Sequence, residues 1–172
     1  MSKLSIINVP DPLLKTVSTP VAKVDSDVRQ LLDNMLETMY AAPGIGLAAI
    51  QVAVAKRMIV VDTSAEEDEN SPLFLVNPEV VWESEEHSVY SEGCLSVPEH
   101  YADIERPMSV RVKYLDYNNE MQETLMDGLT ATCVQHEIDH LDGIVFIDYL
   151  SKLKRNMIVK KVQKAQKDSV IL

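Results

Sequence analysis

The longest periodic run of apolar positions in the first third of the chain has the spacing of one helix face. Asp25 and Ser26 both suit a helix N-cap, and apolar side chains then recur every three or four residues: Val28, Leu31, Leu32, Met35, Leu36, Met39 and Tyr40. Proline disfavours a helical residue before it and glycine frees the backbone, so this helix is expected to end near residues 42–44. The next stretch, GIGLAAIQV, is expected to begin as a loop.

Short apolar runs in the middle of the chain predict β-strands. Residues 58–61 (MIVV) and 73–76 (LFLV) are continuous apolar runs typical of buried strands, and the acidic segment AEEDENSP between them suits a surface loop. Residues 80–82 (VVW) suggest the start of another strand, and residues 109–115 (SVRVKYL) alternate as a half-buried strand does. The pair Asn118-Asn119 then suits a hairpin turn.

Two more helices are predicted after the strands. One follows Asp127-Gly128 and ends near Gly143, and the last runs from about residue 151 to residue 167. An apolar stripe is sufficient to pack this last helix with its lysines outward, and consists of Leu150, Leu153, Met157, Ile158, Val162 and Ala165. The strands are grouped before the second helix and no repeat or linker interrupts them, so we predict a single α+β domain over residues 1–172.

The composition agrees with one domain and removes several classes of protein. The 172 residues are 46% hydrophobic and 25% charged, which is ordinary for a globular domain. The first ten residues lack the apolar region of a signal peptide, and no apolar stretch approaches the roughly 20 residues that span a bilayer. Only Cys94 and Cys133 could form a disulfide, so we expect a cytoplasmic protein with reduced thiols and no membrane partner.

The net charge of −11 argues against nucleic-acid binding over the whole surface, because phosphate would be repelled, and no sequence-specific binding is expected. The charge is nevertheless uneven. Between residues 152 and 167 there is no acidic residue, and seven of the 16 basic residues stand there: Lys152, Lys154, Arg155, Lys160, Lys161, Lys164 and Lys167.

The strongest chemical signal is QHEIDHL, which places His136 and His140 four residues apart on the predicted second helix. Side chains at i and i+4 share one helix face, so both imidazoles can reach one ion at about 2.0–2.1 Å. Glu137 lies beside that face and is placed to take a proton from a water on the metal. The alternative is a surface helix that carries two histidines by chance.

A catalytic metal site needs a third protein ligand and an open position for water. No Glu or His follows His140, which weakens the assignment to proteases that take this ligand from downstream. Cys133 shares the helix face but lies about 10 Å from His140 along the axis, so it is expected to fill the wall behind the site. Of the remaining donors, which are Cys94, His87 and His100, Cys94 is the leading candidate, although spacing alone does not bring it to the helix.

Three segments taken together resemble signatures of the peptide deformylase family. They are GIGLAAIQ at 44–51, EGCLS at 92–96 and QHEIDHL at 135–141, and the similarity extends from NVPDPLLK to FIDYLSKLKR. The resemblance implies antiparallel strands packed around a central HExxH metal-binding helix, with an N-terminal and a C-terminal helix. It also implies a hydrolase that removes the formyl group from the N-terminal formyl-methionine of nascent proteins and releases formate.

The resemblance implies roles for individual residues as well. One divalent ion, usually Fe²⁺ in this family and replaceable by Zn²⁺, Ni²⁺ or Co²⁺, would be held by Cys94, His136 and His140. Glu137 would move a proton from the water to the leaving amine. The side-chain amide of Gln51 and the backbone N–H of Leu95 would stabilise the oxyanion.

The substrate pocket is predicted from the resemblance and from the helix face that carries His136. Its expected lining is Gly44, Ile45, Gly46, Tyr90, Glu92, Gly93, Leu129, Thr132 and Cys133. An unbranched methionine side chain would fit beside the metal, and the peptide would lie extended against the backbone near Gly46. Arg106 is expected to pair with Asp139 or Glu92 and so to orient a ligand. Tyr101 stands where many relatives place a basic residue, which removes a basic contact from the pocket rim.

Two rival functions use the same residues differently. A general metalloendopeptidase would cut internal peptide bonds with the same histidines, but the cysteine in place of a downstream ligand counts against it. A non-enzymatic ribosome-associated binder would have no use for Glu137 or Gln51. Within the resembled family, the basic C-terminal helix can dock on the ribosome, which suits a helix that faces ribosomal RNA.

Overall fold

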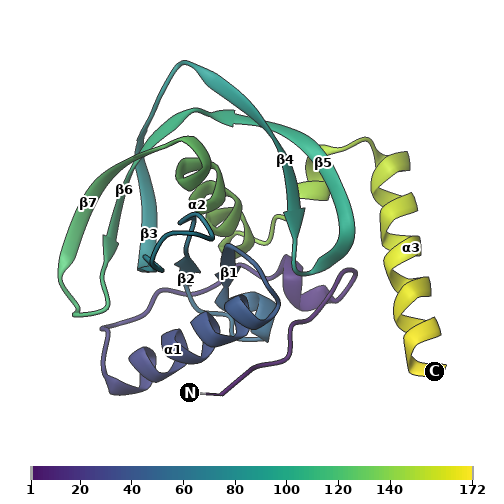
Figure 1. Cartoon of the computed structure of the whole chain (residues 1–172), viewed down its shortest axis with the longest axis horizontal. Coiled ribbons are helices and arrows are strands. Elements are labelled where there is room, and N and C mark those ends of the chain that lie inside the picture. Colours follow the sequence, from purple (N-terminus) through teal and green to yellow (C-terminus); the bar gives the residue numbers. More distant parts are fainter. Residues whose placement is uncertain (1, 172) are drawn as a thin grey trace.

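Three α-helices and seven strands make up the described part of the chain, which covers the backbone of residues 2–171 and the side chains of residues 2–168 in a computed structural model (Figure 1). The helices are α1 (Ser26–Ala41), α2 (Gly128–Leu141) and α3 (Lys152–Ile171), with short 3₁₀ helices η1 (Pro12–Lys15), η2 (Ala49–Val52) and η3 (Phe146–Tyr149). The strands are β1 (Gly46–Ala48), β2 (Met58–Val61), β3 (Leu73–Glu83), β4 (His87–Cys94), β5 (Val97–Pro107), β6 (Ser109–Leu115) and β7 (Met121–Asp127).

The strands form two antiparallel sheets. The larger sheet has the order β1-β2-β3-β6-β7, and the smaller one is the hairpin of β4 and β5. The alternating residues 109–115 form a half-buried strand as predicted, since every second side chain is buried: Val110, Val112 and Tyr114. The prediction of an α+β fold with antiparallel strands and three helices is therefore confirmed.

The prediction of two separate strands at 73–76 and 80–82 is wrong, because both segments belong to β3. The Asn77-Pro78 pair reads as a break in the sequence, but the chain passes it through an irregularity in the pairing with β6. Asn77 adopts a positive φ of 52°, and its side chain exchanges two hydrogen bonds of 2.8 Å with the backbone of Val21. The backbone of Val21 therefore satisfies the hydrogen-bonding groups of the Asn77 side chain, and the strand continues past this residue.

The helix α2 lies between the two sheets (Figure 1) and contacts β1, β2, β6 and β7 of the larger sheet and β5 of the smaller one. It is buried along most of its length, from Ala131 to Glu137 and again at His140 and Leu141. The helix α1 begins as predicted, with the Asp25 side chain accepting a hydrogen bond from the backbone of Val28. Its buried face, which includes Leu32, packs against β1 and β2.

The helix α3 stands at one side of the molecule and contacts only a small part of it, chiefly β5 and η3 (Figure 1). Only part of its predicted apolar stripe packs: Val162 is buried and Ile158 is half-buried, whereas Leu153 and Met157 are 73% and 49% exposed. The expected stripe therefore packs only in part, because α3 meets too little of the fold to cover all of it. Among the described residues, no helix combines the length and the apolar character that crossing a membrane requires.

Candidate active site and metal centre

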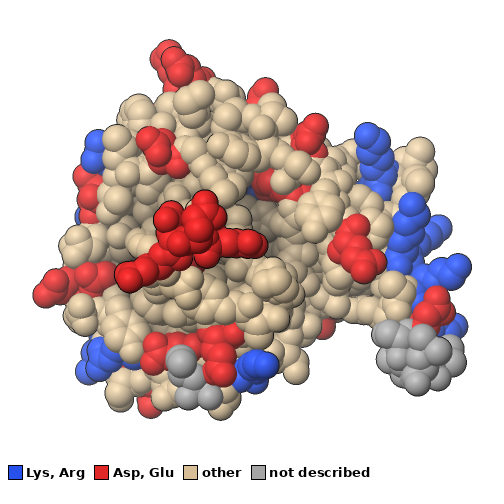
Figure 2. Space-filling view, viewed as in Figure 1, with Lys and Arg blue, Asp and Glu red and all other residues tan. Residues whose placement is uncertain are grey.

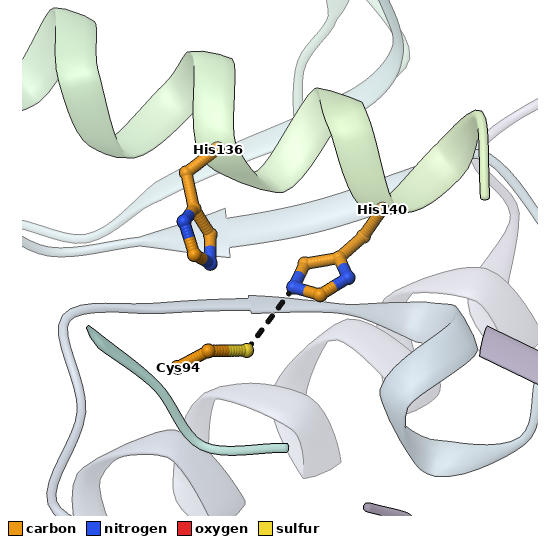
Figure 3. Close-up of side chains that lie close together, drawn as sticks. All are labelled: Cys94, His136 and His140. Carbon is orange, nitrogen blue, oxygen red and sulfur yellow. Dashed lines mark hydrogen bonds between the residues drawn. The ribbon is translucent and has the colours of Figure 1, made fainter. Parts of the chain in front are cut away.

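Three donor side chains from two distant segments meet at the centre of the molecule. His136 and His140 point from one face of α2 toward Cys94 at the end of β4 (Figure 3). The ligand atoms of the three residues lie within 4.8 Å of one another, and Cys94 Sγ is 3.3 Å from His140 Nε2. One ion with bonds of about 2.0–2.3 Å bridges a span of nearly this size. The thiol and two imidazoles suit a divalent transition metal, so the donor set fits such an ion.

His136 is held in place by a buried hydrogen bond to Glu92. Its Nδ1 atom lies 2.9 Å from Glu92 Oε1, which directs the other ring nitrogen toward the cluster. Arg106 donates two hydrogen bonds to Glu92, at 2.6 and 2.9 Å, and a third to Asp139 at 2.9 Å. The predicted pairing of Arg106 with Asp139 or Glu92 is therefore confirmed for both partners. Burial raises the pKa of Glu92, but hydrogen bonds from His136 and Arg106 outweigh it, and the net pKa is lowered.

Glu137 projects into the site from α2 and is buried. Its Oε2 atom lies 4.0 Å from His136 Nε2, and its Oε1 atom has no hydrogen-bond partner among the described residues. Desolvation is the main cause that raises the pKa of Glu137 to about 7, which suits a group that both accepts and donates a proton. Gly46 makes room for this carboxylate, since a Cβ atom there would stand 2.5 Å from Glu137 Oε2.

Gln51 is fixed at the other side of Cys94. The Ala48 backbone donates to its side-chain oxygen at 2.9 Å, which orients the amide nitrogen toward Ser96 Oγ at 3.0 Å and Cys94 Sγ at 3.5 Å. Its own backbone oxygen accepts from Ile7 at 2.8 Å, so the N-terminal segment supports the site from behind. The contributions of Ser96 and Ile7 could not be predicted from residue type or spacing.

A cavity of about 820 Å³ opens beside the donor cluster. Every residue of the predicted substrate pocket lines it, together with Gln51, Cys94, Leu95, His136 and Glu137. Its further lining includes His100, which the sequence placed at the rim, and five residues that the sequence did not indicate: Ile6, Asn8, Ser91, Val97 and Glu99. Tyr101 is 69% exposed at the rim, and its ring lies over Gly93, where a Cβ atom would come within 2.5 Å of it. The cavity is therefore lined by polar and apolar side chains both along α2 and along β4 and β5.

Cys133 is not part of the donor cluster. Its thiol lies 3.6 Å from the Ile45 carbonyl oxygen, and it is buried in the wall of the cavity. Burial, aided by the charge of Glu137, raises the pKa of Cys133 well above its ordinary value and keeps it a neutral thiol. His87 and His100 are also absent from the one group of three potential ligands among the described residues.

Comparison with known proteins decides between the interpretations of this geometry. The family model for polypeptide deformylase matches residues 3–156, which is most of the chain. The chain belongs to the peptide deformylase family. It is 56% identical to the peptide deformylase of Rhizobium meliloti over 162 residues, which is 94% of this chain and 93% of that protein. It is 54% identical to the peptide deformylase of Pelagibacter ubique over 172 residues, and the match covers 100% of both chains.

Solved deformylase structures have the same fold. The crystal structure of peptide deformylase from Ehrlichia chaffeensis superposes with a TM-score of 0.94 at 44% identity, covering 98% of this chain and 99% of that one. A structure from the same organism in complex with actinonin superposes with a TM-score of 0.91 at 47% identity, covering 96% and 98% of the two chains. The chain is thus a metal-dependent deformylase that removes the N-formyl group of formyl-methionine from nascent proteins and releases formate. Membership of this family argues against the two rival functions, the general metalloendopeptidase and the non-enzymatic binder.

Proposed function

We propose that Cys94, His136 and His140 hold one divalent ion, Fe²⁺ in the cell, which Zn²⁺, Ni²⁺ or Co²⁺ can replace. The convergence of these three side chains within 4.8 Å is the observation that carries the proposal. When bound, such an ion lowers the pKa of a water and polarises the formyl carbonyl. Residues that line the cavity carry out the proton transfer and stabilise the oxyanion.

In this proposal Glu137 accepts a proton from the attacking water and delivers it to the departing amine. Its buried carboxylate, with one unpaired oxygen, is placed to do so next to the histidines. The amide nitrogen of Gln51 and the backbone N–H of Leu95 donate to the formyl oxygen as negative charge develops on it. Contacts with Ala48 and Ser96 hold the Gln51 amide beside Cys94 before the substrate binds.

We further propose that the cavity takes the methionine side chain against α2, at Leu129, Thr132 and Cys133. The peptide then runs extended between Gly44–Gly46 and β4, with backbone pairing in place of side-chain recognition. This mode suits an enzyme that acts on nascent chains of many sequences. Residues 1–172 would act as one catalytic domain in the cytoplasm.

The activity is tested by formate release from a short formyl-methionyl peptide. Protein purified without oxygen and supplied with Fe²⁺ or Ni²⁺ is expected to release formate and to leave casein intact. Cleavage of casein would indicate an endopeptidase. Bound metal without turnover of either substrate would indicate a binder.

We propose that α3 contacts the ribosome. Lys and Arg gather on α3 at one end of the molecule (Figure 2), while the chain as a whole carries a net charge of −11. Changing the exposed Lys160, Lys161 and Lys164 to glutamine is expected to weaken cosedimentation with ribosomes severalfold at low salt, because fewer counterions are then released from the RNA. The matched control changes the exposed Lys3, Lys23 and Lys56, which lie outside α3. Equal cosedimentation of both triple variants and the wild type would refute the contact.

A further inference from the structure

A chain of polar contacts links η3 to the donor cluster. The Tyr149 hydroxyl donates to Asp139 Oδ2 at 2.7 Å, and Arg106 donates to the same oxygen at 2.9 Å. Arg106 in turn holds Glu92, whose Oε1 atom lies 2.9 Å from His136 Nδ1. Each link in this chain is a hydrogen bond with at least one charged partner, and such bonds are stronger than neutral ones.

Tyr149 also covers the middle of this chain. The Arg106 guanidinium carbon lies 5.3 Å from the centre of the Tyr149 ring, within the range of a cation–π contact. Arg106 is only 6% exposed, whereas Tyr149 is 54% exposed and forms the outer side of the contact. The phenol thus limits the positions that Arg106 can adopt and shields it from water.

The same 3₁₀ turn contacts His136 at its opposite end. Phe146, the first residue of η3, stacks on the His136 ring with centroids 6.0 Å apart and planes 28° from parallel. The turn therefore meets the histidine twice, directly through Phe146 and indirectly through Tyr149. If Tyr149 only anchored η3 to the core, it would not need to share the Asp139 oxygen with Arg106 or to lie against the Arg106 guanidinium.

We propose that Tyr149 is a positioning residue that fixes the orientation of His136 toward the metal through Asp139, Arg106 and Glu92. The proposal rests on the proposed role of His136 as a ligand. Burial, followed by the hydrogen bond to Asp139, raises the pKa of Tyr149, so the phenol stays a hydrogen-bond donor at neutral pH. Without the Tyr149 hydroxyl, Asp139 Oδ2 would keep its hydrogen bond from Arg106 but lose the one from Tyr149. Asp139 and Arg106 would then be less firmly fixed, and so would the Glu92 carboxylate that Arg106 holds.

The test compares Tyr149→Phe with wild type loaded with cobalt. Loss of a partner that touches a ligand costs about 10- to 100-fold in metal affinity, so for this more remote hydroxyl we expect metal loss to a chelator to be about 3- to 10-fold faster. The visible absorption of the bound cobalt is expected to shift as the His136 ring reorients, while KM for the formyl peptide stays unchanged. The matched control is Tyr117→Phe, which removes a phenol bonded to Asp33 at 3.1 Å, far from the site.

A second comparison separates positioning from simple anchoring. If Tyr149 acts through Asp139, the effects of Tyr149→Phe and Asp139→Asn on chelator-driven metal loss are expected to be non-additive in the double variant. Wild-type rates of metal loss and an unchanged cobalt spectrum in Tyr149→Phe would overturn the proposal. If His136→Ala kept wild-type metal affinity, the assignment of His136 as a ligand would fail instead, and this outcome is distinct from the first.

Discussion

Changing Glu137 to glutamine is expected to reduce formate release by about 10³-fold or more while the metal stays bound, since general acid–base groups contribute about 10²- to 10⁴-fold. The substitution preserves the size of a side chain that packs against Gly46. It removes the ability to accept a proton from water. Glu137 is absent from the cluster of ligand atoms, so the affinity for the ion should change little.

The measurement is formate release at saturating peptide, with metal content determined on the same samples. Glu123→Gln, which changes an exposed carboxylate on β7, is the matched control and should keep wild-type turnover. A Glu137→Gln variant that loses its metal would make Glu137 part of the metal site. A variant that keeps both metal and turnover would remove Glu137 from the proton transfer.

Elements with strong local periodicity were predictable from the sequence. The helix α1 and the strands β2 and β6 lie where the apolar pattern placed them, because α1 and β6 each bury one face and β2 is buried on both faces. The strands β4 and β5 were not predicted, since several of their side chains on both faces are exposed or half-buried and no apolar run marks them. Their pairing with each other and their packing near α2 and η3 are tertiary effects that a local pattern does not encode.

The candidate site divides in the same way. The two histidines share a helix face, so their approach follows from local geometry, whereas Cys94 lies 46 positions from His140 in the chain and reaches it only through the fold. Residue chemistry alone favoured Cys94 as the third ligand, and the family resemblance supplied the roles of Gln51 and Leu95. The hydrogen bonds of Tyr149 and Ser96 could not be predicted from their residue types, because a tyrosine or serine has many structural uses.

Changing Cys94 to serine is expected to remove the metal and with it the activity. Loss of a direct ligand should weaken binding by more than the about 10- to 100-fold that an outer partner contributes, and a serine hydroxyl replaces a soft thiolate poorly. Serine remains small enough to sit beside Gln51, whose amide lies 3.5 Å from the sulfur, so the fold should persist. Formate release should fall to background.

A stability measurement gives an independent reading of the same change. An ion present at 100 times its Kd stabilises the folded state by about 2.7 kcal/mol, which raises Tm by about 5–10 °C in a chain of this length. Added Ni²⁺ should therefore raise the Tm of wild type but not that of Cys94→Ser. Cys133→Ala is the matched control, because this thiol lies outside the donor cluster and the variant should keep both the metal and the Tm increase. If Cys94→Ser kept the increase and Cys133→Ala lost it, the two cysteines would have exchanged roles, and the coordination proposed for this site would be wrong.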